Sequence, residues 1–211
     1  MIEVRRATAR EVRVSCVRYH YAHAVPLVSD AYSVFAGGAF CGTVCFGSGA
    51  NYHIGEPYGL VQGQVLELVR VALNGRQGHG HTSEAVMAAV RRLHRDRPSV
   101  RLLVSYADES QGHAGKIYQA TNWIYVGEYG AGDSCAFVIN GRRMHKKSVY
   151  SQWGKCSLSW LREHVDPGAC EVRAAGKYKY LYPLDRRMRR KVMPLALPYP
   201  REASGTDEVR A

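Results

Sequence analysis

The sequence predicts an α/β fold, in which a mixed central sheet is flanked by helices and a basic strand and helix follow at the carboxyl-terminal end. Two observations predict it. Apolar segments with strand character alternate with helical patterns, and a glycine-rich turn joins a buried strand to the main helix. The length of 211 residues fits one domain with a short tail. We therefore expect a single catalytic domain at residues 1–195 and a proline-rich, disordered tail at 196–211.

The expected elements follow from periodicity and from breaker residues. They are a helix at 8–19, a hairpin at 31–35 and 39–46, a strand at 65–73, a helix capped by Thr82 or Ser83 and closed by Pro98, a strand at 100–105, a short helix at 114–121, a strand at 123–128, a hairpin at 135–139 and 142–146 turning through Asn140-Gly141, a strand at 177–182, and a helix at 186–191 capped by Asp185.

Composition excludes several classes of protein. Hydrophobic residues make up 46% of the chain and charged residues 22%, and no apolar run approaches the roughly 20 residues that span a bilayer. Residues 1–10 are charged and do not form a secretory signal, so we expect a cytoplasmic protein with no membrane partner. The six cysteines contain no CxxC pair, which argues against a zinc ribbon and against a disulfide framework.

The positive charge is concentrated in one stretch. Residues 142–191 hold 14 Lys and Arg against 4 Asp and Glu, whereas the rest of the chain is nearly neutral. Aromatic residues are interleaved with these charges, so the stretch indicates a phosphate-binding surface of the kind that holds nucleic acid. A solvated basic face without a partner is the alternative.

The glycine-rich turn between the strand at 65–73 and the following helix is a candidate cofactor site. Glycines allow close approach to a pyrophosphate, and the helix N-terminus attracts its charge. The candidate residues are Arg76, Gly78, Gly80, His81 and Thr82. A tight strand-to-helix connection without a ligand is the alternative.

The segment at 116–123, KIYQATNW, resembles the segment that follows the fifth strand in acyl-CoA-dependent N-acetyltransferases of the GNAT superfamily. The order of elements around it has the same shape. The resemblance implies an acyl donor such as acetyl-CoA, and it implies that Tyr118 protonates the departing thiolate. A core tyrosine is the alternative for this residue.

A narrower resemblance is to the phage Mom family. Residues 103–123 look like its most distinctive block, and 20–23, 65–73 and 177–187 look like further blocks. The resemblance implies a GNAT-like fold and a phage enzyme that converts adenine N6 in duplex DNA to a carbamoylmethylated form, which protects phage DNA from host restriction. The glycine turn is closer to the general acetyltransferase pattern, which leaves a smaller substrate open.

Two charged residues are candidate catalytic groups. Asp108 follows the strand at 100–105, where sheet enzymes of this layout place ligands, and could accept a hydrogen bond from N6. Arg70 is a charge inside an apolar strand and needs a partner, for which a phosphate, a carbonyl group and Asp108 are candidates. Glu67 faces the opposite side in a regular strand, so it is not an obvious partner. A loop-capping carboxylate and a structural ion pair are the alternatives.

His20, Tyr21 and His23 form a further polar cluster. His20 and Tyr21 are candidates for a base or for contact with a flipped nucleobase, and the resemblance implies iron as a metal, with His20 and Asp108 as tentative ligands. A histidine in a hydrogen-bonded loop is the alternative.

The strand at 177–182 alternates lysines with tyrosines. The lysines are expected on one face toward phosphate, and the tyrosines on the other, against the core. The expected nucleic-acid contacts are Lys177, Lys179, Tyr180, Arg186, Arg187 and Arg190, and the expected partner is double-stranded DNA.

Three functions remain open. The first is DNA modification, for which an activated glycine is the alternative donor, because acetyl transfer would leave an amide on N6 and not a carbamoylmethyl group. A conventional GNAT acetyltransferase acting on a small amine or RNA with acetyl-CoA is the second function. A DNA-binding accessory protein without chemistry is the third.

Overall fold

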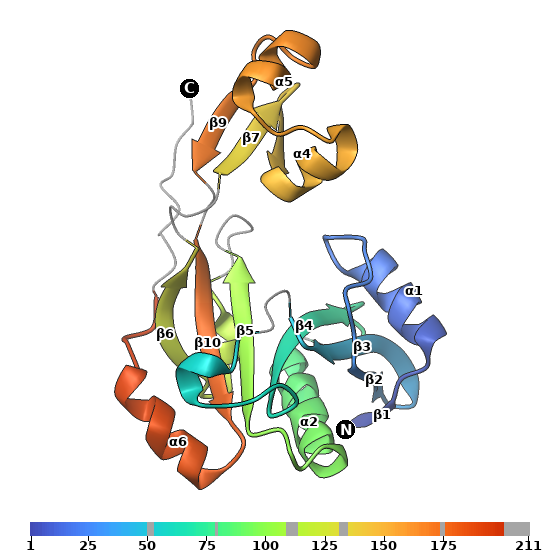
Figure 1. Ribbon diagram of the computed structural model, residues 1–211. Helices are drawn as coiled ribbons and strands as arrows, with labels where there is room; N and C mark the ends of the chain where they lie inside the picture. Colours follow the sequence, from blue (N-terminus) through green and yellow to red (C-terminus); the bar gives the residue numbers. More distant parts are fainter. Residues whose placement is uncertain (50–52, 79, 109–113, 131–134, 174–175, 201–211) are drawn as a thin grey trace, which may run out of the picture. The chain divides into compact units, whose positions relative to one another are not determined.

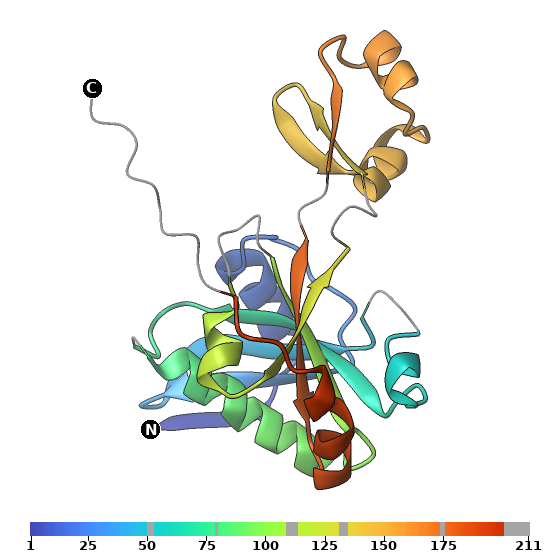
Figure 2. The same cartoon turned by 90° about the vertical axis from the view of Figure 1, so that its left-hand side faces the viewer.

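The computed structural model of the protein describes residues 1–49, 53–78, 80–108, 114–130, 135–173 and 176–200, and the chain divides into two compact units (Figures 1 and 2). The first unit contains residues 1–106, 115–126 and 179–200. The second contains the described residues within 107–114 and 127–178. The sequence predicts one domain over most of this length. Of the tail expected to be disordered, the described residues 196–200 include Leu197, whose N–H donates to the carbonyl oxygen of Tyr125 (2.9 Å).

The strands and helices of both units follow one another as the sequence predicts, with some additions. The elements are β1 (Ile2–Arg6), α1 (Ala9–Tyr19), β2 (Asp30–Ala36), β3 (Ala39–Gly47), η1 (Glu56–Tyr58), β4 (Val65–Leu73), α2 (His81–Asp96), β5 (Leu102–Asp108), α3 (Lys116–Ala120), β6 (Ile124–Tyr129), β7 (Cys135–Ile139), β8 (Arg142–His145), α4 (Lys146–Trp153), α5 (Leu158–His164), β9 (Cys170–Arg173), β10 (Lys177–Pro183), α6 (Arg186–Val192) and η3 (Met193–Leu195). The sequence analysis missed β1, α4, α5 and β9.

A seven-stranded sheet runs in the order β1-β2-β3-β4-β5-β10-β6. Strands β1 to β4 pair antiparallel with their neighbours, and β4 pairs parallel with β5, so the sheet is mixed as predicted. Helix α1 packs on β3 and β4, and α2 packs on β1, β2 and β3 (Figure 1). Met188 and Val192 of α6 lie in a core cluster with Leu102 and Leu181 from the sheet. The α/β fold is therefore confirmed.

Local chemistry explains where the helices begin. Thr8 caps α1 by accepting the N–H of Glu11, and the Glu11 carboxylate accepts the N–H of Thr8 (2.8 Å). Asp185 caps α6, as predicted, by accepting the N–H of Met188 (2.7 Å). Helix α2 instead begins after Gly80, whose φ of 85° is left-handed. The predicted cap at Thr82 or Ser83 is therefore wrong.

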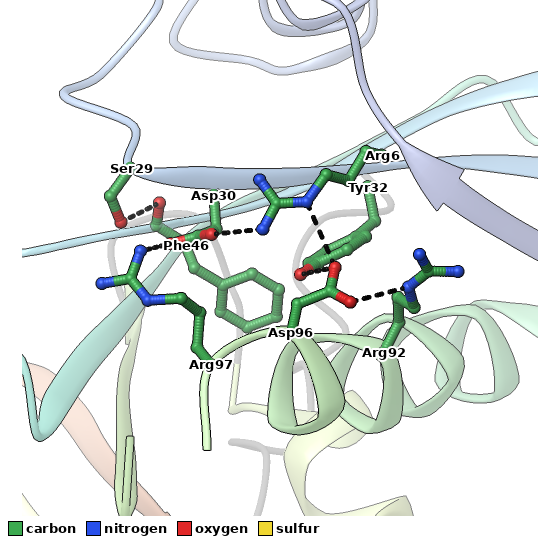
Figure 3. A network of polar contacts seen from close by, with 8 residues as sticks. All are labelled: Arg6, Ser29, Asp30, Tyr32, Phe46, Arg92, Asp96 and Arg97. Carbon is green, nitrogen blue, oxygen red and sulfur yellow. Dashed lines mark hydrogen bonds and ion pairs between the residues drawn. The ribbon is translucent and has the colours of Figure 1, made fainter. Parts of the chain in front are cut away.

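A polar network fixes the far end of α2 against β1 and β2 (Figure 3). Asp30 is 1% exposed and forms ion pairs with Arg6 (3.4 Å) and Arg97 (3.1 Å). Asp96, the last residue of α2, accepts hydrogen bonds from Arg6 (3.2 Å) and from the Tyr32 hydroxyl (3.1 Å).

The second unit has a core of its own. Its three-stranded sheet has the order β8-β7-β9, and Phe137 and Ile139 of β7 pack with Val149 of α4 and Leu161 of α5. The predicted turn at Asn140-Gly141 is confirmed. Both residues have positive φ (50° and 71°), as a type I′ hairpin requires.

Candidate functional site

Strands β4 and β5 separate partway along their length. In the described part of the chain, their backbone pairing joins residues 65–67 to residues 102–104 and does not extend further. One step beyond it, the Ser105 hydroxyl donates to the carbonyl oxygen of Leu68 (3.1 Å). Ser105 is fully buried. Its side chain therefore bridges the two strands inside the protein, at the point where their backbone pairing ends. A bulge also interrupts β4 here, because Cys45 and Phe46 pair with Arg70 and Leu68 and skip Val69.

Tyr118 of α3 reaches this opening. Its hydroxyl oxygen lies 2.7 Å from Ser105 Oγ. The Tyr118 ring packs against the rings of Tyr180 (5.0 Å between centroids) and Trp123 (5.1 Å). Burial raises the pKa of Tyr118 to about 12, opposed by the Ser105 hydrogen bond and assisted by the charges of Glu67 and Tyr21. The phenol is therefore protonated at neutral pH, as a proton donor must be.

The three oxygen atoms at the opening share a limited number of protons. Ser105 has a single hydroxyl proton, and the Leu68 carbonyl oxygen can only accept. When Ser105 donates to Leu68, Tyr118 completes the chain by donating to Ser105. When Tyr118 loses its proton, Ser105 can rotate its hydroxyl and donate to the phenolate. The arrangement can therefore support both protonation states of Tyr118.

Gly115 permits the approach of α3 to β10. Its φ is 77°, and a Cβ atom built on it would lie 2.6 Å from the Tyr180 ring. Only glycine adopts this conformation without strain and leaves room for the ring. The placement of Tyr118, three residues later, depends on this close approach.

The glycine turn and the start of α2 form a pocket of about 550 Å³ with α3. Of the predicted cofactor residues, Gly78, Gly80 and Thr82 line it, together with Gln77 and Lys116. Gln77 Oε1 is buried and has no hydrogen-bond partner among the described residues. The N–H groups of the first helical turn and Lys116 suit the negative charge of a phosphate. The residues present therefore fit an acyl donor that carries phosphates, such as a coenzyme A thioester.

Two predicted cofactor residues do not line this pocket. Arg76 is exposed, and the His81 ring lies with Nδ1 2.7 Å from the Glu84 carboxylate. This contact lies in the first turn of α2, where an acidic side chain interacts favourably with the helix dipole. The role of His81 as a cofactor contact stays a prediction.

Arg70 is half-buried, and its guanidinium donates to the carbonyl oxygen of Val69 (2.8 Å), one of the three partners considered from the sequence. Its Nε is buried without a partner among the described residues. The bulge at Val69 shifts the alternation of β4 by one residue. The expectation that Glu67 and Arg70 face opposite sides, which assumed a regular strand, is therefore wrong.

The histidine cluster follows α1. His20 Nδ1 accepts the N–H of Ala22 (3.1 Å), and the His20 and Tyr21 ring centroids are 4.2 Å apart. His23 Nδ1 lies 2.8 Å from the carbonyl oxygen of Val17. Both histidines are thus held in a hydrogen-bonded loop, and Tyr21, which is 51% exposed, lies near enough to Tyr118 to affect its pKa.

Asp108 is the last residue of β5 and does not follow the strand as predicted, because β5 extends three residues beyond the expected end at 105. It belongs to the second unit, whereas His20 belongs to the first. Among the described residues no three His, Cys, Asp or Glu side chains come together in a way that could hold a metal ion. Cys16, Cys41 and Cys45 are buried free thiols.

The geometry of β10 changes the expected nucleic-acid contacts. Strand β10 lies inside the sheet, between β5 and β6. Lys179 is half-buried with its ammonium group 5.3 Å from the centre of the Tyr58 ring, and burial lowers the pKa of Lys179. Tyr180 is fully buried. The expectations for these two residues are therefore corrected, because Tyr180 is buried in the core and Lys179 packs over the Tyr58 ring.

Other predicted contacts remain available on the surface. Lys177, Arg186, Arg187 and Arg190 are exposed, and Arg186 and Arg190 line a surface hollow with Arg189, Met193 and Pro194. Of the predicted nucleic-acid contacts in the first unit, the exposed ones thus lie on α6.

The sequence analysis missed Ser105 and dismissed Glu67. Ser105 gave no signal, because a serine in an apolar strand resembles any small core residue. Glu67 is half-buried in β4, and its charge contributes to the pKa of Tyr118. A carboxylate in an otherwise apolar strand was the available signal.

Comparisons with known proteins indicate the family and the fold of this chain. The model of the Mom protein family matches residues 1–201. The methylcarbamoylase mom of Escherichia phage Mu is 26% identical over 172 residues, which cover 78% of this chain and 69% of that protein. The aminoglycoside acetyltransferase AAC(6')-Ib, solved with coenzyme A and kanamycin, is 12% identical with a TM-score of 0.52, covering 90% of this chain and 98% of that one.

A second solved structure, the aminoglycoside N-acetyltransferase AAC(6')-Ib11, is 13% identical with a TM-score of 0.51, covering 89% of this chain and 98% of that one. These likenesses support the GNAT-like fold. Within the described part of the chain, no helix is long and apolar enough to pass through a bilayer.

Proposed function

Because the chain belongs to the Mom protein family, we propose that it is a transferase that modifies adenine N6 in duplex DNA and protects phage DNA from host restriction. The family match carries this proposal, and the name of the phage Mu relative supports a carbamoylmethyl-type product. The opening between β4 and β5, with Tyr118 inside it and the glycine-turn pocket beside α3, supplies a suitable place for group transfer.

Each residue of the opening can be given a chemical role. A coenzyme A thioester bound at the glycine turn would supply an activated acyl group. Tyr118 is then placed to protonate the departing thiolate, and Ser105 to donate to the phenolate that this leaves. Removal of the N6 proton needs a base, for which Asp108 remains our first candidate and Glu67 becomes the second. His20 and Tyr21 are proposed to contact the target base.

The donor follows from the atoms of the product. Acetyl transfer leaves N6 bonded to a carbonyl carbon, whereas carbamoylmethyl is attached through its methylene carbon and ends in a carboxamide. A glycyl group on N6 has the same atoms as carbamoylmethyl. We therefore favour transfer of an activated glycine followed by isomerisation. In this isomerisation the bonds from N6 to the carbonyl carbon and from the methylene carbon to the amine nitrogen break. Bonds from N6 to the methylene carbon and from the carbonyl carbon to the amine nitrogen form, so no atom is gained or lost. Feeding cells glycine labelled with ¹³C and ¹⁵N should place both labels in the modified adenine, and absence of both labels rejects this donor.

Digestion of DNA to nucleosides and mass spectrometry after expression of the protein tests the main proposal. A new adenine species carrying carbamoylmethyl at N6 is expected, and cells expressing the Tyr118→Phe variant should lack it. Unmodified DNA together with acetylated RNA or a small amine would favour the conventional acetyltransferase. Unmodified DNA and RNA together with intact DNA affinity would favour an accessory protein without chemistry.

Helix α6 is the proposed contact with DNA in the first unit. Replacing Arg186, Arg187 and Arg190 with Ala should weaken binding equally for all sequences, because interactions with phosphate carry no sequence information. The slope of log K against log salt should flatten by about 0.9 for each phosphate that the variant no longer neutralises. A folded triple variant with an unchanged slope would remove α6 from the interface.

A further inference from the structure

The second unit contains an uninterrupted basic segment. Residues 134–162 include six Lys and Arg and no Asp or Glu. The acidic residues that follow, Glu163, Asp166 and Glu171, lie at the end of α5, in the next turn and in β9. Asp166 already accepts the N–H of Asn140 (2.6 Å). Basic and acidic residues are therefore separated along this part of the chain. The basic residues lie mainly on β8, on α4 and in the turn after α4, and the acidic residues follow them.

The fold of this unit places most of these basic side chains on consecutive elements. Strand β8 is an edge strand, α4 begins at the residue that follows it, and α4 packs on β7 and β8. Arg142 pairs with Ile139 across the hairpin and therefore emerges on the face that α4 covers. Lys146 and Tyr150 are four residues apart on α4 and share one side of it. Both are exposed, with Tyr150 at 60%.

This arrangement is unfavourable for the unit in isolation. The N-terminus of a helix carries a partial positive charge, so cations near it are destabilising. Helix α4 nevertheless begins with Lys146-Lys147, shortly after Arg142-Arg143, and has no acidic residue in its first turn. Lysines at the start of an exposed helix are an unfavourable choice, which is explained when an anionic partner neutralises their charge.

We infer that the β8–α4 surface, defined as Arg142, Lys146, Tyr150 and Lys155, binds the phosphate backbone of duplex DNA. This inference rests on the proposed function. It gives the second unit a part in holding the duplex, in addition to the contact proposed for α6 in the first unit. Lys179 of β10, which is half-buried over the Tyr58 ring, does not perform this task. The three cations can contact phosphates, and the exposed Tyr150 hydroxyl can donate to a phosphate or a sugar oxygen.

The test measures affinity for a duplex of mixed sequence over a range of salt concentrations. The variant Arg142→Ala/Lys146→Ala/Lys155→Ala should bind roughly tenfold or more weakly, and its salt slope should fall by about 2.7 if each of the three cations neutralises one phosphate. The control variant Arg13→Ala/Arg91→Ala/Arg95→Ala removes the same charge from exposed positions on α1 and α2 and should behave as wild type.

A second variant protects the test against misfolding. Arg142→Lys/Lys146→Arg/Lys155→Arg keeps the charge and should retain the wild-type slope. An alanine variant that matches the control overturns the inference while leaving the proposed function intact. A wild-type protein without duplex affinity overturns the proposed function itself. If the wild-type protein binds single-stranded RNA of the same length more tightly than duplex DNA, and the alanine variant loses this binding, the partner of the surface is RNA and not duplex DNA.

Discussion

Ser105 should contribute to stability and to the chemistry of Tyr118, and Ser105→Ala tests both. The hydroxyl is fully buried and contacts two oxygen atoms, those of Leu68 (3.1 Å) and Tyr118 (2.7 Å). Its removal leaves both buried groups without this partner, which costs about 1–3 kcal/mol. For a protein of this size, each kcal/mol lowers Tm by roughly 2–4 °C.

Ser15→Ala is the matched control. Ser15 is also fully buried, but its hydroxyl has no hydrogen-bond partner among the described residues. Removing an unpaired buried hydroxyl should be neutral or stabilising. Urea unfolding of both variants measures the difference. Equal decreases in unfolding free energy would show that the Ser105 hydrogen bonds do not stabilise the β4–β5 opening.

The effect on proton transfer needs a separate measurement. Placing 3,5-difluorotyrosine at position 118 brings the phenol pKa into an accessible range, where ¹⁹F NMR can follow the titration. Removal of the Ser105 hydroxyl should raise the pKa of this phenol, because the phenolate then lacks its donor. An unchanged pKa in the Ser105→Ala background would mean that Ser105 does not act on Tyr118.

Four further predictions follow from the same structure. Tyr118→Phe and Asp108→Asn should each reduce DNA modification by about 10²–10⁴ while duplex affinity stays within about threefold, and full activity in either variant removes that residue from the mechanism. Gly115→Ala should destabilise the protein by roughly 1–3 kcal/mol, measured by urea unfolding, because its φ is positive and its Cβ would meet the Tyr180 ring, whereas Gly141→Ala is strained but meets no neighbour and should cost less. Arg97→Ala should destabilise the protein more than Asp30→Asn, because it removes a positive partner from the Asp30 carboxylate, which is only 1% exposed. Asp30→Asn removes the negative charge itself and leaves an arginine that water can solvate. The reverse order of stability in thermal melts contradicts this. Stability should fall as pH rises from about 10 to 12. Burial raises the pKa of Tyr118 to about 12 in the folded state, so the phenol of the unfolded chain loses its proton at lower pH than that of the folded protein. Tyr118→Phe should therefore show a flatter dependence of unfolding free energy on pH.

The order of elements could be predicted because it depends on short stretches of sequence. The Asn140-Gly141 hairpin and the Asp185 cap each rest on interactions within a few residues, and the strand at 65–73 is recognised from its local apolar pattern; each is present. The start of α2 was misplaced, because Gly80 ends the turn through its left-handed backbone and leaves no side-chain cap to recognise. The helices α4 and α5 were missed because they are short and their stability comes from packing on β7.

The sequence by itself determined the family resemblance, the mixed α/β fold and the concentration of positive charge in residues 142–191. These depend on composition, periodicity and motif, which a linear chain displays. Only the tertiary structure decided that Ser105 contacts Tyr118, that a bulge turns Glu67 and Arg70 out of simple alternation, and that Lys179 packs over Tyr58. These contacts join residues from different elements. Strand alternation alone predicts which side chains share a face. It does not predict where a bulge changes the alternation, or which side chains from other elements pack on that face.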